Sequence, residues 1–97
     1  MTHIVFLVPA EEEMLEAAEY YESQRRGLGR TFLAEVQRTV DRIVENPRLG
    51  QAVWQGIRRR LLRRFPFGIL YQVDPDEIVI IAVMHLRRRP GYWSDRV

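Results

Sequence analysis

The sequence predicts an α+β domain in which an N-terminal helix hairpin packs on a small, mostly antiparallel sheet. Three observations predict this class. A β-branched run opens the chain, two stretches with helical periodicity follow it, and the residues after position 55 alternate between strand-like runs and turns. The expected order is β-α-α-β-β-β, in a single domain that covers residues 1–97.

The first strand and the first helix are expected between residues 3 and 26. Residues 3–8 are mostly β-branched or aromatic, which favours a strand, and Pro9 suits the start of a helix. Over residues 10–26 the apolar side chains recur at helical spacing, which predicts one buried stripe of Met14, Ala17, Ala18 and Tyr21. Most of the six glutamates of this helix are expected in solvent, with ion pairs between Glu19 or Glu22 and Arg26 or Arg25.

A second helix is expected over residues 30–45. Its apolar residues again recur every three or four positions, at Leu28, Phe32, Val36, Val40 and Ile43. Gly27 and Gly29 end the first helix, and Asn46-Pro47 ends the second. Because the turn between them is so short, the two helices should form an antiparallel hairpin. Tyr20 and Tyr21 are expected in its core.

Three further strands are expected at residues 56–62, 64–73 and 78–84. The second of them alternates apolar residues on one face, at Phe65, Phe67, Ile69, Tyr71 and Val73. The third is apolar on both faces, so it should be a central strand that is covered on both sides. The helices cover one face of such a sheet, and little chain remains to cover the other. An exposed apolar face predicts a protein partner.

Charge divides the chain into two halves. All fifteen basic residues are arginine, and no lysine or cysteine is present. Residues 1–50 carry six arginines against nine acids, a net charge of −3, whereas residues 51–97 carry nine arginines against four acids, a net charge of +5. A basic half of this kind favours an acidic protein partner or nucleic acid.

The sequence predicts neither a membrane protein nor a cofactor enzyme. No apolar run approaches the roughly 18 residues that span a membrane, and the N-terminus lacks the basic start of a signal peptide, so a cytoplasmic protein is expected. The absence of cysteine excludes a disulfide framework. No glycine-rich phosphate loop, metal-spaced ligand set or serine triad is present, so we expect no cofactor and no metal.

Several short motifs, in order, resemble those of one family over nearly the whole chain. They are Ala17-Ala18-Glu19-Tyr20-Tyr21-Glu22, Gly27-Leu28-Gly29, Phe32-Leu33-Ala34-Glu35-Val36, Asn46-Pro47, Ile57-Arg58-Arg59, Phe65-Pro66-Phe67-Gly68-Ile69-Leu70-Tyr71, Ile81-Ala82-Val83-Met84-His85 and Arg88-Arg89-Pro90-Gly91-Tyr92-Trp93. Each motif alone is weak, but the ordered set resembles the RelE/ParE superfamily of toxins. The resemblance implies the toxin of a type II toxin–antitoxin system, neutralised by a cognate antitoxin protein that wraps over it.

The superfamily has two activities, and the resemblance leaves both open. RelE-type toxins cleave messenger RNA on the ribosome, whereas ParE-type toxins inhibit DNA gyrase and are not nucleases. RelE-type enzymes take their catalytic groups from four places. Two of the four are lost or reduced in this chain: Leu61 leaves Arg59 as the one survivor of a basic pair, and Gly68 stands where the enzymes have an arginine. The other two are kept, because Arg87 matches a later arginine and Tyr92 or Trp93 matches a tyrosine that stacks on a base. Losing a charged group costs transition-state stabilisation, so the pattern favours the gyrase inhibitor.

Three interpretations of the function therefore stand. The leading one is a gyrase inhibitor that catalyses no reaction. It contacts its target or its antitoxin through the basic half and the tail, with the candidate residues Arg58, Arg59, Arg60, Arg64, Arg87, Arg88, Tyr92 and Trp93. The second is a ribosome-dependent nuclease with Arg59, His85, Arg87 and Tyr92 at the phosphate. A different nuclease layout would pair His85 with a carboxylate such as Glu77 and add Arg59 and Arg88. The third is a decayed toxin that only binds its antitoxin.

Each candidate also has a purely structural interpretation. The arginines of residues 58–64 can be a solvated strand edge, where charge blocks pairing with another sheet. His85 can be a hydrogen-bonding residue at the end of a buried strand. Tyr92 and Trp93 can simply cover the edge of the sheet.

Overall fold

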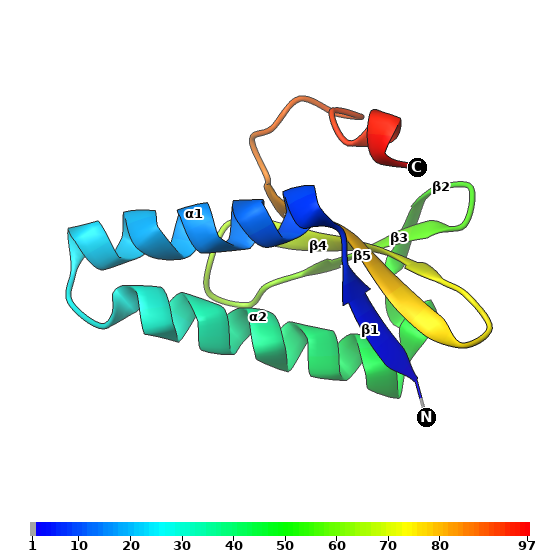
Figure 1. Cartoon of the computed structure of the whole chain (residues 1–97), viewed down its shortest axis with the longest axis horizontal. Coiled ribbons are helices and arrows are strands. Elements are labelled where there is room, and N and C mark those ends of the chain that lie inside the picture. Colours follow the sequence, from blue (N-terminus) through cyan, green and yellow to red (C-terminus); the bar gives the residue numbers. More distant parts are fainter. Residues whose placement is uncertain (1) are drawn as a thin grey trace.

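The computed structural model describes residues 2–97 and has the predicted α+β architecture. Strand β1 (His3–Phe6) leads into helix α1 (Val8–Gln24), which turns back into α2 (Leu28–Glu45), as Figure 1 shows. A short 3-10 helix η1 (Pro47–Leu49) precedes β2 (Gln51–Trp54), β3 (Ile57–Leu61), β4 (Phe67–Val73) and β5 (Glu77–His85). The chain ends in η2 (Ser94–Arg96).

The five strands form one mostly antiparallel sheet with the order β1-β5-β4-β3-β2. Only β1 runs parallel to its neighbour, β5, and β5 therefore lies inside the sheet, as its apolar sequence predicts. A bulge interrupts the pairing of β4 with β5 between Leu70 and Tyr71. The sheet thus has the expected type, with one strand more than expected.

The additional strand is β2, which the expected order β-α-α-β-β-β omits. Its four residues are exposed on both faces, so no alternation of apolar and polar residues marks it. It forms a hairpin with β3, and Gly56 occupies the left-handed conformation at φ 70° that this turn requires. The sequence pattern did not reveal β2, because this strand pairs with β3 but adds no side chain to the core beneath the helices.

The helix hairpin forms as predicted, with a different polar contact at its turn. The Glu22 carboxylate accepts hydrogen bonds from the backbone N–H groups of Gly27, at 3.0 and 3.1 Å, and of Gly29, at 3.1 Å. These bonds lower the pKa of Glu22 and satisfy donors at the start of α2. The expected ion pair between Glu22 and a nearby arginine is therefore wrong.

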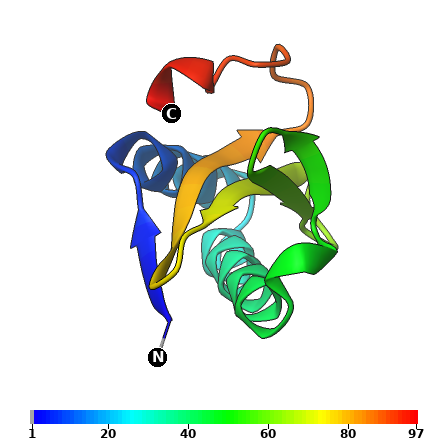
Figure 2. The same ribbon diagram turned by 90° about the vertical axis from the view of Figure 1, so that its right-hand side faces the viewer.

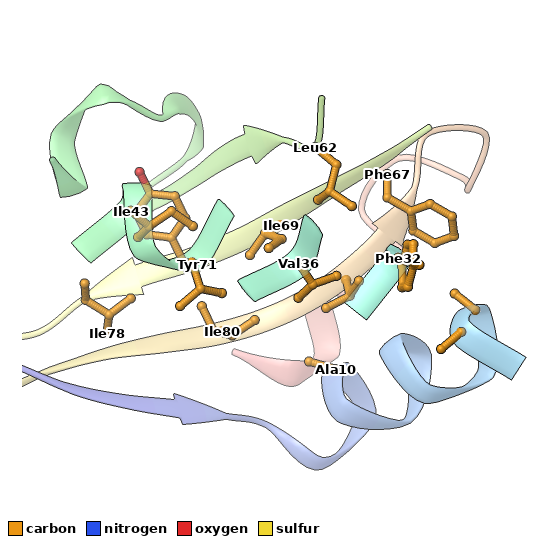
Figure 3. Packing of buried hydrophobic residues seen from close by; sticks show 14 residues of the cluster. Ala10, Phe32, Val36, Ile43, Leu62, Phe67, Ile69, Tyr71, Ile78 and Ile80 are labelled. Carbon is orange, nitrogen blue, oxygen red and sulfur yellow. The ribbon is translucent and has the colours of Figure 1, made fainter. Parts of the chain in front are cut away.

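The main core lies between the helices and one face of the sheet (Figure 3). It gathers apolar side chains from both helices and from β4 and β5, among them Ala10, Phe32, Val36, Ile43, Ile69, Tyr71 and Ile80. Tyr21 packs at its edge, with its ring centroid 4.8 Å from that of Phe65 and 5.3 Å from that of Phe32. Tyr20 is 60% exposed, so its predicted place in the core is wrong.

One carboxylate is buried beside this core. Glu35 on α2 is 2% exposed and accepts hydrogen bonds from the backbone N–H of Arg63 and from the Arg38 guanidinium, both at 3.0 Å. Burial raises the pKa of Glu35, but these hydrogen bonds outweigh burial, so the pKa lies below its ordinary value. The contact fixes the turn after β3 against α2.

Candidate functional site

The face of the sheet turned away from the helix hairpin carries a second, smaller core of Ile57, Leu70, Ile81, Ala82, Met84 and Trp93. The C-terminal segment, residues 86–97, folds back over this face, as Figure 2 shows. It places the Trp93 indole there, 8% exposed, and the ring of Trp54 lies edge-on to it at 6.3 Å. The prediction of an apolar face left uncovered is therefore wrong, because the C-terminal segment covers much of it.

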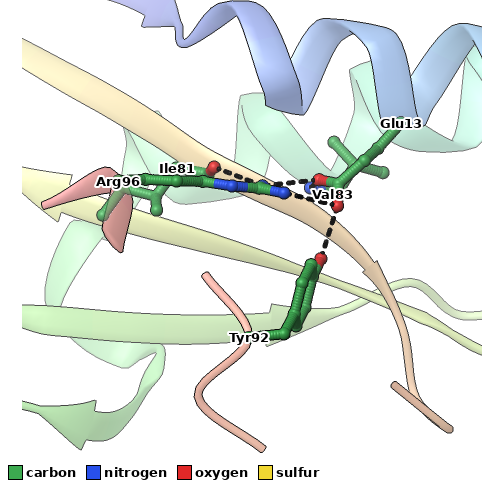
Figure 4. A network of polar contacts seen from close by, with 5 residues as sticks. All are labelled: Glu13, Ile81, Val83, Tyr92 and Arg96. Carbon is green, nitrogen blue, oxygen red and sulfur yellow. Dashed lines mark hydrogen bonds and ion pairs between the residues drawn. The ribbon is translucent and has the colours of Figure 1, made fainter. Parts of the chain in front are cut away.

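One carboxylate holds the C-terminal segment in place (Figure 4). Glu13 on α1 accepts hydrogen bonds from the Tyr92 hydroxyl at 2.6 Å and from Arg96 Nη1 and Nη2 at 2.9 and 3.0 Å. Both charged side chains are largely shielded, with 15% of Arg96 and 17% of Glu13 exposed. Bidentate pairing of this kind is among the stronger polar contacts in proteins.

The same ion pair occupies an edge of β5. Strand β1 pairs with β5 only as far as Ile80. Beyond that point the backbone N–H of Val83 donates to Glu13 at 3.1 Å, and Arg96 Nη1 donates to the carbonyl of Ile81 at 3.1 Å. Two side chains thus satisfy backbone groups that a further strand would otherwise pair, which protects this edge.

The contact also changes the acid–base properties of its members. Burial raises the pKa of Tyr92 well above its ordinary value, and the hydrogen bond to the Glu13 carboxylate raises it further. The hydrogen bond to Glu13 likewise raises the pKa of Arg96. The tyrosine therefore stays protonated and the arginine stays charged at every physiological pH.

A cavity of about 280 Å³, here called the arginine cavity, lies between the C-terminal segment and the sheet. Most of its wall is apolar and comes from Val53, Leu70, Met84, Leu86, Pro90 and Trp93. The charged part of the wall is Arg59 from β3 and Arg88 from the C-terminal segment. The arginine cavity thus combines apolar surface with two guanidinium groups.

Each arginine of the cavity is held by a neighbour. Arg59 Nη2 donates to Gln51 Oε1 at 2.8 Å. A Cβ at Gly68 would come within 3.2 Å of the Arg59 stem, so the glycine leaves room for that stem to lie across β4. The Arg88 guanidinium lies over the Tyr92 ring, 4.2 Å from its centroid. Within residues 2–97 the ion pairs are Arg38–Glu35 and Arg96–Glu13, so neither cavity arginine has an anionic partner.

The other predicted arginines lie elsewhere. Arg58 and Arg60 are paired with Tyr71 and Ile69 on β4, which places them on the helix side of the sheet. Arg58 Nη1 donates to the carbonyl of Gly50 at 2.9 Å, and Nη1 of Arg60 is buried without a hydrogen-bond partner. Arg64 is exposed in the turn after β3. The structure therefore brings together Arg59, Arg88 and Trp93 from the predicted contact set, with Tyr92 beside Arg88.

The four residues of the nuclease interpretation do not form one cluster. His85 and Tyr92 line a different cavity, of about 290 Å³, beside α1, together with Glu13, Glu16 and Arg88. Arg59 instead lines the arginine cavity. The Nδ1 atom of His85 accepts a hydrogen bond from the backbone N–H of Arg87 at 3.0 Å, and its ring packs edge-on to Phe67 at 5.1 Å. The Tyr92 hydroxyl is bonded to Glu13.

The alternative pairing of His85 with Glu77 is wrong. The two residues stand at opposite ends of β5. Eight residue steps along a strand separate them by roughly 26 Å. His85 instead contacts Phe67 and the backbone of Arg87, at the end of β5.

Glu13 is the site residue that sequence reasoning missed. It was expected among the solvated glutamates of the first helix, because nothing in the spacing of Glu11, Glu12, Glu13 and Glu16 distinguishes one of them. Its partners lie 70 or more residues away in the chain. Such a contact leaves no local signal in a single sequence.

Residues 2–97 contain no group of three or more His, Cys, Asp or Glu side chains that could hold a metal ion. None of the helices described in residues 2–97 is both long and apolar enough to cross a membrane.

A helix hairpin on a mostly antiparallel sheet, with the resemblance in sequence, defines a toxin of the RelE/ParE superfamily. The family model described as "ParE toxin of type II toxin-antitoxin system, parDE" matches residues 4–90. The chain therefore belongs to the ParE toxin family.

A solved structure shares the fold. A chain of the "Chromosomal ParDE TA system from P. aeruginosa" superposes with a TM-score of 0.63 at 19% sequence identity, covering 88% of this chain and 96% of its own. Curated protein sequences give no match.

Proposed function

We propose that this ParE-family toxin is neutralised by a cognate antitoxin and that, when free, it inhibits DNA gyrase in the cytoplasm without catalysing a reaction. One observation carries the claim that the toxin catalyses no reaction: the four candidate nuclease residues do not meet at one site. Arg59 lies in a different cavity from His85 and Tyr92, and the hydroxyl of Tyr92 is hydrogen-bonded to Glu13. General acid–base cleavage of RNA needs such groups within hydrogen-bond reach of one phosphate.

An antitoxin partner is supported by three further facts. The family model describes a toxin of a type II toxin–antitoxin system, and the similar P. aeruginosa chain comes from a chromosomal ParDE toxin–antitoxin system. The second half of the chain also carries nine arginines against four acids, so its charge is not balanced internally. An acidic antitoxin would supply that charge.

The deciding experiment compares two reactions with purified toxin. Inhibition of DNA supercoiling by gyrase, reversed by the antitoxin, is the expected result. In a cell-free translation reaction, primer extension should show intact messenger RNA. New cuts at ribosome-bound codons would instead establish the nuclease, and no effect in either reaction would indicate a decayed toxin.

Two variants separate the surfaces involved. Replacing Arg87, Arg88 and Arg89 by glutamine removes exposed charge from the C-terminal segment and leaves Trp93 in place, so gyrase inhibition should fall roughly tenfold or more. His85→Ala should change inhibition less than about threefold, because a packing histidine does no chemistry. A strong loss from His85→Ala alone would contradict the proposal. Deleting the whole segment is uninformative, because it also removes the buried Trp93.

A further inference from the structure

We propose that the arginine cavity binds a segment of the antitoxin in which a carboxylate lies beside an apolar side chain. The identity of the partner rests on the proposed function; the chemistry of the ligand rests on the cavity itself. The apolar side chain would pack on Trp93 and Leu70, and the carboxylate would pair with Arg59 and Arg88.

Charge supports a carboxylate. Of the nine arginines in residues 51–97, Arg96 is the one that forms an ion pair within residues 2–97. Arg59 and Arg88 therefore face the cavity without an anion, from two elements that are distant in sequence. Guanidinium groups bind carboxylates through paired hydrogen bonds.

Shape supports a polypeptide over nucleic acid. The wall consists mostly of aliphatic side chains, Pro90 and the Trp93 indole, and the volume of about 280 Å³ holds one or two side chains. Nucleic-acid sites instead present several cations along a groove to contact successive phosphates. A buried apolar anchor next to a charge pair is the usual centre of a protein–protein interface.

The cavity is already formed in the free toxin. Gln51 holds Arg59, and Tyr92 holds Arg88. Glu13 in turn holds Tyr92, so the outer wall of the cavity is anchored to α1. A preformed site loses little conformational freedom on binding, which raises affinity.

The first test measures antitoxin affinity by calorimetry, with the protein encoded beside the toxin gene. The double variant Arg59→Gln/Arg88→Gln should bind roughly tenfold or more weakly than the wild type. The matched control Arg25→Gln/Arg26→Gln carries the same charge change on exposed residues at the turn of the helix hairpin, which do not line the cavity, so its affinity should fall less than about threefold. Equal losses in the two double variants would overturn the proposal. Circular dichroism confirms that each variant is folded.

The second test needs no antitoxin, so it separates failure of this proposal from failure of the proposed function. N-acetyl-leucine carries a carboxylate beside an apolar side chain, and N-acetyl-leucinamide is its neutral match. Titration of each is followed by the NMR signal of the Trp93 indole N–H, assigned with Trp54→Phe. The acid should shift this signal, and the amide should shift it far less.

The outcomes are distinct. Equal shifts from acid and amide, or none from either, would overturn the site. Tighter binding of a short RNA than of the acid, lost in Arg59→Gln/Arg88→Gln, would assign the cavity to nucleic acid and also overturn it. If wild-type toxin fails to bind the antitoxin but the acid binds the cavity, the partner is wrong and the ligand chemistry stands.

Discussion

At the scale of single residues, Tyr71 fixes the connection between the helix hairpin and the sheet. Its hydroxyl donates to the carbonyl of Pro47 at 2.5 Å and accepts from the N–H of Gly50 at 3.1 Å. Burial raises the pKa of Tyr71, so the hydroxyl remains a donor. The aromatic side chain was predicted on the inner face of its strand, but its polar role follows from residues more than 20 positions away.

We expect Gly50→Ala to destabilise the fold by about 1–3 kcal/mol. The φ of Gly50 is ordinary, at −64°, but an added methyl group would overlap the Tyr71 hydroxyl, which is fully buried and doubly hydrogen-bonded. Urea unfolding measures the cost. Tyr71→Phe is the partner substitution, because it removes the hydroxyl and should reduce the cost of Gly50→Ala. Additive effects of the two changes would show that the overlap is not the cause.

Glu35 makes stability depend on pH. Its pKa is lower in the folded protein than in the unfolded chain, so its contribution is fully present above the ordinary glutamate range near pH 4.5 and is lost as the pH falls through the folded pKa. Glu35→Gln should therefore cost about 1–2 kcal/mol at pH 7 and progressively less in acid. Unfolding at several pH values checks this. Glu45→Gln, at the exposed end of the same helix, is the control for the loss of one carboxylate. A pH-independent cost for Glu35→Gln would contradict the expectation.

At the scale of elements, the spacing of apolar residues predicted the helix and strand faces that form the main core. The apolar stripe of α2 and the alternation of β4 through Phe67, Ile69 and Tyr71 are both confirmed in the main core. Element ends differ from the prediction by a few residues; for example, β4 starts at Phe67 instead of Arg64. β2 could not be predicted, because its four exposed residues carry no packing pattern.

The C-terminal segment could not be placed either, because one distant ion pair holds it. We expect Glu13→Gln to let this segment open while the rest of the protein stays folded, since the substitution leaves Arg96 without its shielded partner. The anchor should weaken by about 1–3 kcal/mol. Trypsin, which cleaves after the exposed Arg87 and Arg88, should then cut the native protein roughly tenfold or more faster.

Glu12→Gln is the matched control for this change, because Glu12 is an exposed neighbour on the same helix. Its cleavage rate should equal that of the wild type. Hydrogen exchange distinguishes local from global opening. Amides of residues 92–96 should lose protection in Glu13→Gln while those of α2 keep it. Equal loss in both regions would mean that the segment and the core unfold together.

At the scale of the whole molecule, the sequence alone predicted the fold class and the division of charge, and it named some residues that line the arginine cavity. Arg59, Arg88 and Trp93 were among the candidates and do line one cavity. Arg58 and Arg60 were also candidates and lie on the helix side of the sheet. Alternation along a strand assigns its residues to two faces, but it does not say which face the rest of the chain will cover.

The division of charge predicts how the toxin meets its antitoxin. Because residues 51–97 carry a net +5 and the ion pairs leave most of their arginines free, the association rate with an acidic antitoxin should fall roughly tenfold or more from low to physiological salt. Replacing Arg87, Arg88 and Arg89 by glutamine should flatten that dependence. Arg25→Gln/Arg26→Gln/Arg30→Gln changes the same charge at the turn of the helix hairpin and should leave it nearly unchanged. Stopped-flow fluorescence measures both rates. If the two triple variants flatten the salt dependence equally, only the net charge of the toxin steers the encounter. A larger effect of the variant at Arg87, Arg88 and Arg89 would locate the steering on the C-terminal segment.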